Sequence, residues 1–140
     1  MDNVMKLEFI NMSCNERFAR SVAASFTAIL DPTIEELTEI KTAVSEAVTN
    51  AIIHGYNGEI GNVIMEGRIH GRCVEFAVKD FGCGIADIDK AREPMYTDKP
   101  DMERSGMGFT IMEAFMDEIY VESIVGQGTT VTMKKTLSER

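Results

Sequence analysis

Two neighbouring segments constrain this chain most: a helix that carries Glu46 and Asn50, and the sequence DFGCG at residues 80–84, which directly follows a strand. Apolar residues recur at helical spacing through residues 34–54, which predicts a long helix there. Because an α-helix turns by about 100° per residue, Glu46 and Asn50 lie on one face, and Val44 and Val48 point roughly the opposite way. The sequence thus predicts a polar pair held away from the buried side of a helix.

The side chains of this pair suit phosphate chemistry. The carboxamide oxygen of Asn50 is a hard ligand of the kind that Mg²⁺ accepts, and Mg²⁺ is held by one or two protein groups plus substrate phosphates. Glu46 can act as a general base where it reaches the proton of a nucleophile. A Glu–Asn pair is also common on a solvated helix face, so the pair alone does not decide between these interpretations.

Asp80 ends a strand and begins the DFGCG segment. Gly82 and Gly84 let the backbone turn sharply and approach a ligand closely. An aspartate at this place can accept a hydrogen bond from an exocyclic amine such as that of adenine. A plain turn at the end of the strand explains the same residues. The DFG triplet also occurs in protein kinases, but the strand lysine, glycine-rich loop and H-R-D segment of those kinases are absent from the sequence.

A second glycine-containing segment precedes the next predicted helix. Exposed N–H groups and the helix dipole make such a start a ready site for an anion, although a simple loop-to-helix turn has the same sequence. Arg104 at its edge is placed to pair with phosphate. Further along, Thr129 and Thr130 are expected to be ordinary strand residues, although one of their hydroxyls is placed to reach a water beside a base. The candidate anion-binding residues are Ser105, Gly106, Met107 and Gly108.

The order of predicted elements defines the fold class. Alternating apolar residues predict strands at 4–12, 63–70, 73–79, 118–125 and 129–135. Capping-box patterns at Ser13 and Thr33 predict two helix starts, and the first helix carries a stripe of Phe18, Val22, Phe26 and Ile29. Residues 85–105 have little periodicity, which is uncommon within a domain unless the loop is functional. We expect an α+β two-layer sandwich with a mixed, mainly antiparallel sheet and helices on one face.

Charge and length narrow the possible partners. The 140 residues suffice for one domain, and the formal net charge of −9 argues against non-specific nucleic-acid binding. The same charge means that a bound polyphosphate would need a divalent cation and backbone N–H groups. No apolar run is long enough to cross a bilayer, and the N-terminus lacks a signal pattern, so we expect a cytoplasmic protein.

Taken together and in this order, the segments resemble the motifs of the GHKL superfamily, the Bergerat-fold ATPases that include gyrase, Hsp90, histidine kinases and MutL. The segment SEAVTNAIIHGY resembles the N box of that superfamily, and the segments DFGCG and RSGMGF resemble its two glycine boxes. The last motif resembles GQGTTVTM. The match runs from about residue 40 to residue 133. A free-standing module of this length is similar to the anti-sigma factor serine kinases of that superfamily.

The resemblance implies roles for individual residues. Glu46 would act as the base toward a protein hydroxyl, Asn50 would bind Mg²⁺, and Asp80 would receive the adenine amine. Residues 85–105 would form the ATP lid. The nucleotide, ATP or ADP, would be lined by Gly82, Gly84, Arg104, Ser105, Gly106, Met107 and Gly108, with Thr130 supporting the base.

The resemblance also implies partners: a sporulation sigma factor held by a homodimer, and an anti-anti-sigma protein whose serine is phosphorylated. Arg20 on the first helix is the candidate partner contact. Two other functions fit the same motifs. One is a non-catalytic module in which ATP only shapes a protein-binding surface, and the other is a stand-alone ATP hydrolase. Glu46 separates the kinase from the binding module, because a module without catalysis needs no base.

Overall fold

The computed structural model describes residues 2–56, 58–92 and 108–139, and it places five strands and four α-helices within them. The strands are β1 (Asp2–Ile10), β2 (Asn62–His70), β3 (Cys73–Asp80), β4 (Glu118–Ile124) and β5 (Gly128–Thr136). The helices are α1 (Asn15–Ala28), α2 (Ile34–Asn50), α3 (Ile88–Ala91) and α4 (Gly108–Phe115), with one π-helical turn, η1 (Ala51–Gly55), continuing α2.

The strands form one open sheet in the order β1-β2-β3-β5-β4. Each neighbouring pair is antiparallel, so the sheet in the described part of the chain is wholly antiparallel. Two tight connections explain part of this order: β2 returns as β3, and β4 returns as β5. The β5 strand inserts beside β3, which leaves β4 at the edge of the sheet.

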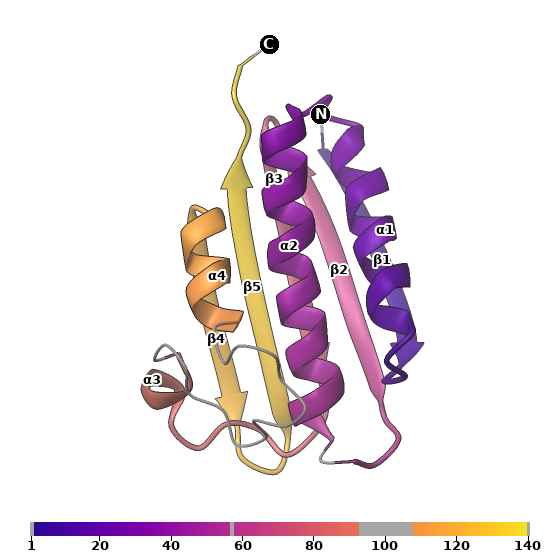
Figure 1. Ribbon diagram of the computed structural model, residues 1–140, viewed down its shortest axis with the longest axis vertical. Helices are drawn as coiled ribbons and strands as arrows, with labels where there is room; N and C mark the ends of the chain where they lie inside the picture. The colour runs from indigo at the N-terminus through magenta and orange to yellow at the C-terminus, as the bar shows by residue number, and fades with distance from the viewer. Residues whose placement is uncertain (1, 57, 93–107, 140) are drawn as a thin grey trace.

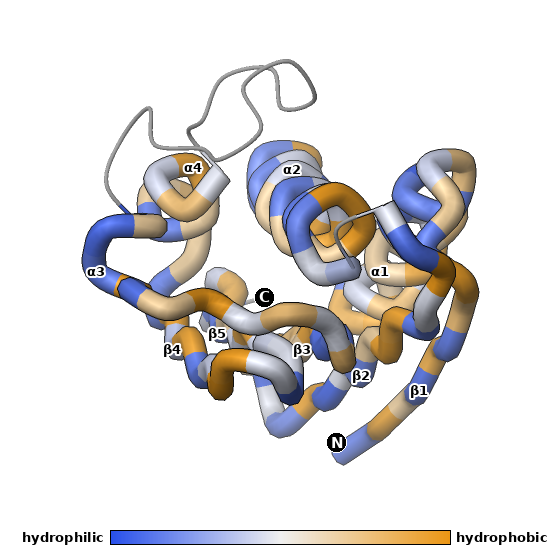
Figure 2. Tube along the Cα trace, turned by 90° about the horizontal axis from the view of Figure 1, so that it is seen from below, coloured by the Kyte–Doolittle hydropathy of each residue, from blue (hydrophilic) through white to orange (hydrophobic). Residues whose placement is uncertain are grey.

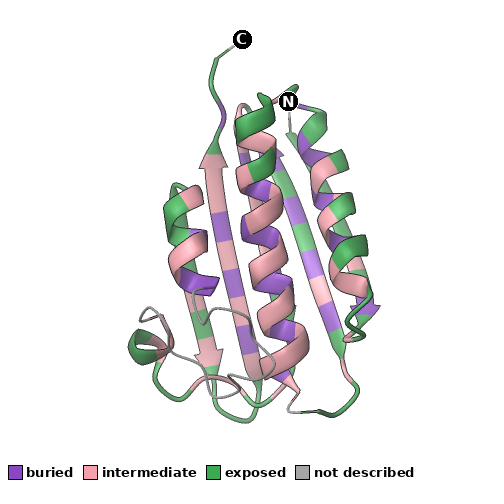
Figure 3. Cartoon of the chain, viewed as in Figure 1, coloured by how far each residue is buried: buried purple, intermediate pink, exposed green. Residues whose placement is uncertain are grey.

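The helices lie on one face of the sheet. In Figure 1, α2 runs along the middle of the sheet between α1 and α4, and Figure 2 shows the three helices in a row above the strands. Buried and more exposed residues alternate along β2 and β5 (Figure 3), as expected for strands covered on one side only. The predicted α+β two-layer architecture is confirmed.

The core fills the space between the helices and the sheet. Phe26 of α1 meets Phe76 of β3 edge to face, with ring centroids 6.0 Å apart and planes at 71°. Gly67 of β2 leaves room for this contact, since a Cβ there would lie 2.9 Å from the Phe26 ring. The predicted inward face of β3 is confirmed, because Val74, Phe76 and Val78 are all buried.

The first helix matches its predicted stripe in part, since Phe26 is buried and Val22 packs against the core, whereas the other two members of the stripe do not. Its buried residues are Ala19, Ala23, Phe26 and Thr27, whereas Phe18 is 50% and Ile29 is 47% exposed. The small alanines face the core because they let α1 approach its neighbours closely, and Phe18 and Ile29 turn outward. The predicted capping box at Ser13 is also wrong: Cys14 is the N-cap residue, and no side chain caps the helix.

The second helix follows its prediction more closely. The capping box is present, with Thr33 Oγ1 accepting from the N–H of Glu36 at 3.0 Å and Glu36 Oε1 accepting from the N–H of Thr33 at 2.9 Å. Ile40, Val44 and Val48 are fully buried against the sheet. The last predicted turn is present, but it is π-helical.

Charged side chains fasten the end of the sheet where both termini lie. Arg72 donates to the carbonyl oxygen of Leu30 at 2.6 Å and to that of Ser138 at 2.7 Å. The second oxygen of Glu36 accepts from the N–H of Ser138 at 2.7 Å. The hydrogen bonds that Glu36 accepts, chiefly those from the backbone N–H groups of Thr33 and Ser138, lower the pKa of Glu36 to about 2. The start of α2, the β2–β3 turn and the C-terminal segment are thereby tied together.

Within the described residues, the structure holds no helix that combines the length and the apolar character required to span a membrane.

Candidate nucleotide-binding site

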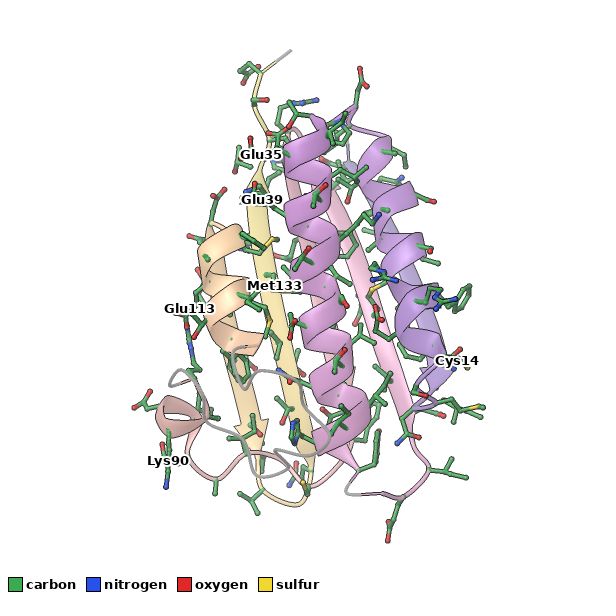
Figure 4. The ribbon with its side chains drawn as sticks, viewed as in Figure 1. Cys14, Glu35, Glu39, Lys90, Glu113 and Met133 are labelled. Atoms are coloured by element: carbon green, nitrogen blue, oxygen red, sulfur yellow. The ribbon has the colours of Figure 1, made fainter. Side chains whose placement is uncertain are left out.

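The described residues of the predicted nucleotide site lie toward the opposite end of the sheet from the termini. The last turns of α2, the loop after β3 and the β4–β5 hairpin all lie at the lower end in Figure 1. By contrast, Glu35 and Glu39 mark the upper part of α2 in Figure 4. The long helix therefore has one end near the termini and the other end in the candidate site.

The start of α4 meets the polar pair on α2. A Cβ placed on Gly108 would lie 3.2 Å from Glu46 Oε2 and 3.3 Å from Asn50 Nδ2. Glu46 and Asn50 are half-buried, whereas the neighbouring Ala47 and Val48 are buried in the core. The structure thus brings together three predicted site residues from segments about sixty positions apart. Because Gly108 has no side chain, the space beside Glu46 and Asn50 stays open at the N-terminus of α4.

The π-helical turn joins the same helix to the loop after β3. Gly55 lies against Asp80, since a Cβ on Gly55 would be 2.8 Å from the Asp80 Cγ atom. The carbonyl oxygen of Gly55 accepts from the N–H of Cys83 at 2.6 Å. Gly82 passes so close to that carbonyl that a Cβ on it would lie 1.5 Å from the oxygen. A π-helical turn within an α-helix commonly marks a functional site.

Asp80 is a buried carboxylate, 5% exposed. Its Oδ1 atom accepts from the N–H of Gly82 at 3.0 Å. Burial raises the pKa of Asp80, and hydrogen bonds from the backbone of Gly82 and Thr129 offset only part of that effect. A carboxylate held out of water in this way is positioned to accept a hydrogen bond from a ligand.

Glycines give the loops around Asp80 their shape. Gly128 has a φ of +125°, and a Cβ on it would lie 2.1 Å from the carbonyl oxygen of Asp80. Gly84 has a φ of +77°, and a Cβ on it would lie 2.4 Å from the carbonyl oxygen of Ile124. Both positions need glycine because a side chain would be strained and would clash. The first glycine-containing loop and the β4–β5 hairpin are thus held against each other.

Tyr56 was missed by the sequence reasoning. Its hydroxyl accepts from the N–H of Phe81 at 2.7 Å and donates to the carbonyl oxygen of Asn62. Burial raises the pKa of Tyr56, and the charge of Asp80 adds to this effect, so the phenol keeps the proton that it donates. A tyrosine directly after a predicted helix end gave no signal of this contact, which depends on residues 25 positions away.

Thr129 lies beside Asp80, and Thr130 does not. Thr129 is the register partner of Asp80 and is 9% exposed. Thr130 pairs with Lys79, and its side chain therefore points to the opposite face of the sheet. The threonine beside Asp80 is thus Thr129, one residue before the predicted Thr130. Because successive residues of a strand point to opposite faces of the sheet, the shift of one residue moves the predicted side chain from the site to the uncovered face.

Four of the predicted residues, Arg104, Ser105, Gly106 and Met107, lie outside the described residues, as does most of the predicted lid at 85–105. The described part of that segment contains α3, after which Arg92 donates to Glu113 of α4 at 2.6 and 2.8 Å. Glu113 and Lys90 are labelled in Figure 4. The lid itself stays a prediction.

Arg20 pairs with Glu16 one turn earlier on α1, at 3.6 Å. The same Glu16 Oε2 atom accepts a hydrogen bond from Ser45 Oγ at 2.8 Å. Arg20 is therefore linked through Glu16 to the residue that precedes Glu46 on α2. The structure places Arg20 near the helix that carries the polar pair.

The described residues do not gather three or more histidine, cysteine, aspartate or glutamate side chains into a metal-binding group. This is compatible with Mg²⁺ bound as a nucleotide complex, because Mg²⁺ keeps several waters and takes few protein ligands. The carboxamide oxygen of Asn50 fits that donor set. It is a hard neutral ligand beside the space that Gly108 leaves open.

An antiparallel sheet covered by helices on one face, with these motifs at one end, defines the class of this domain. A sequence model described as the histidine kinase-like ATPase domain matches residues 15–135. Two solved structures have the same fold. The RsbU and RsbW domains of Rv1364c from Mycobacterium tuberculosis align with a TM-score of 0.73 and 20% identity, covering 99% of this chain and 33% of that one. The catalytic domain of the histidine kinase ThkA aligns with a TM-score of 0.61 and 18% identity, covering 95% of this chain and 96% of that one.

Curated relatives identify the group within this class. The anti-sigma F factor of Geobacillus thermodenitrificans is 59% identical, with 99% of this chain and 96% of that protein covered. The anti-sigma F factor of Clostridium perfringens is 57% identical, with 99% of each chain covered. That of Clostridium kluyveri is 56% identical, with 98% and 96% covered. The chain therefore belongs to the histidine kinase-like ATPase domain family and, within it, to the anti-sigma F factors.

Proposed function

We propose that residues 1–140 form one ATP-dependent protein-serine kinase domain that also binds and inhibits a sporulation sigma factor. Its substrate would be a serine of an anti-anti-sigma protein, which phosphorylation inactivates. The observation that supports this most is the convergence of Glu46, Asn50 and Gly108 at one end of α2. The names of the relatives support the sigma factor as a partner.

The proposed roles follow from the placement of each group. The adenine amine would donate to the buried Asp80 carboxylate, and Asn50 would hold Mg²⁺ together with the phosphates. When bound, Mg²⁺ neutralises the charge that develops on the transferred phosphoryl group. Glu46 would accept the proton of the attacking serine hydroxyl. The described glycine residues of the site, Gly82, Gly84 and Gly108, keep the backbone close to the nucleotide. We also propose Thr129 in place of Thr130 as the hydroxyl on the base side.

A homodimer is part of the proposal, with the sigma factor held by both subunits and Arg20 among the contacts. The Glu16 link between Arg20 and Ser45 supports this surface, because it connects a partner contact on α1 to the helix of the proposed base. Light scattering of the chain with and without the sigma factor tests the stoichiometry. A monomer in both conditions would contradict the dimer.

Replacing Glu46 by glutamine is the direct test of catalysis. The variant keeps size and polarity, so we expect ATP affinity to change little. Phosphotransfer to the anti-anti-sigma protein should fall by about 100-fold or more, as for the loss of a general base. Labelled ATP, phosphosite mapping and a nucleotide titration measure the two effects separately. Glu35→Gln is the matched control, because Glu35 is exposed at the far end of the same helix.

Each alternative outcome has a distinct interpretation. Unchanged phosphotransfer in Glu46→Gln would remove Glu46 from its role. A wild-type protein that binds ATP and the sigma factor but transfers no phosphate would be the non-catalytic binding module. Steady phosphate release without any protein acceptor would indicate an ATP hydrolase.

A further inference from the structure

Three polar side chains form a row across the sheet at the site. Ser123 of β4 is the register partner of Thr129 of β5, and Thr129 is the register partner of Asp80 of β3. Side chains of register partners in an antiparallel sheet share one face. The row therefore lies on the helix-covered face, and Ser123 stands behind Thr129 as seen from Asp80.

The hydroxyl of Ser123 makes three short contacts. Its oxygen accepts from the N–H of Ile85 at 2.7 Å, and it lies 3.1 Å from the carbonyl oxygen of Gly128 and 2.8 Å from Thr129 Oγ1. The carbonyl oxygen of Gly128 can only accept, and a serine hydroxyl has one proton. All three contacts are hydrogen bonds only if Ser123 donates to Gly128 and Thr129 donates to Ser123.

This arrangement fixes the direction of the Thr129 hydroxyl. Its proton points to Ser123, and its remaining lone pairs are free to accept. The ionised carboxylate of Asp80 also offers lone pairs only. The wall made by Asp80 and Thr129 thus consists of acceptors, and turning the threonine proton toward the site would break the part-buried hydrogen bond to Ser123.

We propose that Ser123 is a specificity-determining residue that orients the Thr129 hydroxyl, so that the site selects purine nucleotides with an amino group at position 6. This inference rests on the proposed function, in which the purine base lies against Asp80. An amino group at position 6 can donate two hydrogen bonds, one to each of the acceptors Asp80 and Thr129. An oxo group at the same position has no proton to donate, so its lone pairs would face the lone pairs of those two side chains. Ser123 acts on selectivity through Thr129 and is a positioning residue.

The test compares the affinities for ATP and for inosine triphosphate, which carries an oxo group at position 6. In Ser123→Ala, the Thr129 hydroxyl is free to turn and donate. We expect the preference for ATP to fall by about fivefold, as for one neutral hydrogen bond. Ser123→Thr keeps the hydroxyl and should restore the wild-type preference. Thr132→Ala is the control on the uncovered face, where Thr132 pairs with Ala77 and Tyr120.

A double-mutant cycle separates selectivity from stability. Thr129→Val removes the hydroxyl, so adding Ser123→Ala to it should leave the preference unchanged. An unchanged preference in Ser123→Ala alone would overturn the inference, as would an equal loss of affinity for both nucleotides, which marks a merely structural role. If the wild-type protein binds neither nucleotide, the proposed function fails at that earlier step. If it binds both equally, the inference fails while the proposed function stands.

Discussion

The two ends of the sheet use charged side chains in opposite ways. At the end with the termini, Arg72 and Glu36 bind backbone groups of the α1–α2 connection and of the C-terminal segment, and these hydrogen bonds to Glu36 lower its pKa to about 2. At the site end, Asp80 is buried and its pKa is raised. The negative charge of Glu36 stabilises the fold, whereas burial disfavours the negative charge of Asp80. We expect the first carboxylate to contribute to stability and the second to ligand recognition.

The largest contrast is expected between two glycines in turns. In Gly82→Ala the new Cβ would lie 1.5 Å from the Gly55 carbonyl oxygen, so the loop must move away from α2. A displacement of about 1 Å is enough to lower phosphotransfer about 100-fold. Gly71→Ala, at the other end, meets nothing within 4 Å but has a φ of +60°. It should cost about 1 kcal/mol of stability and leave nucleotide binding unchanged. Kinase assays and denaturant unfolding measure both. Equal loss of activity in the two variants would contradict the separation of the ends.

Asp80→Asn should separate binding from stability. We expect ATP binding to be lost, since the amide is a weaker acceptor than the carboxylate. The folded-state pKa of Asp80 is raised above its usual 3.8, so the ionised form opposes folding once the pH rises through the folded pKa. At neutral pH the variant should therefore unfold at a higher temperature than the wild type. Calorimetry and nucleotide titration check the two effects. Normal ATP affinity in Asp80→Asn would refute the assignment of the site.

Glu36→Gln is expected to give the smaller effect, with the opposite sign. Because the pKa of Glu36 is lowered from 4.5 to about 2, its charge stabilises the fold at neutral pH, and this contribution is lost as the pH falls toward about 2. The variant should be less stable than the wild type at neutral pH, with the difference vanishing in acid and ATP affinity unchanged. Thermal unfolding across this range measures the effect. A difference that persists at the acid end would show that the charge of Glu36 is not its cause.

Local patterns in the sequence predicted most of the fold. The Thr33 capping box, the alternation in β3 and the hairpin at residues 126–128 each depend on neighbouring residues, and each is present. The failures involve contacts between distant segments. The face of α1 is set by how closely its alanines approach other elements, and helical periodicity alone pointed to Phe18 and Ile29 instead.

The candidate site shows the same limit. Glu46, Asn50 and Asp80 were found from motifs, and the structure places Gly108 beside the first two. Tyr56 was missed because its hydroxyl contacts Phe81, 25 positions further along the chain, and Ser123 was missed because its contact with Thr129 depends on the register of β4 and β5. The choice between Thr129 and Thr130 depends on register, since a shift of one residue reverses the face of a strand.

The π-helical end of α2 has a consequence for how the domain folds. The carbonyl oxygen of Gly55 accepts from the N–H of Cys83, and that of His54 accepts from the Cys83 thiol at 3.3 Å. The cap of this helix is therefore supplied from 28 and 29 positions downstream, beyond β2 and β3 in the sequence. The helix end and the loop after β3 should accordingly form and open as one cooperative unit. A chain still emerging from the ribosome would hold an incomplete helix until that loop is synthesised.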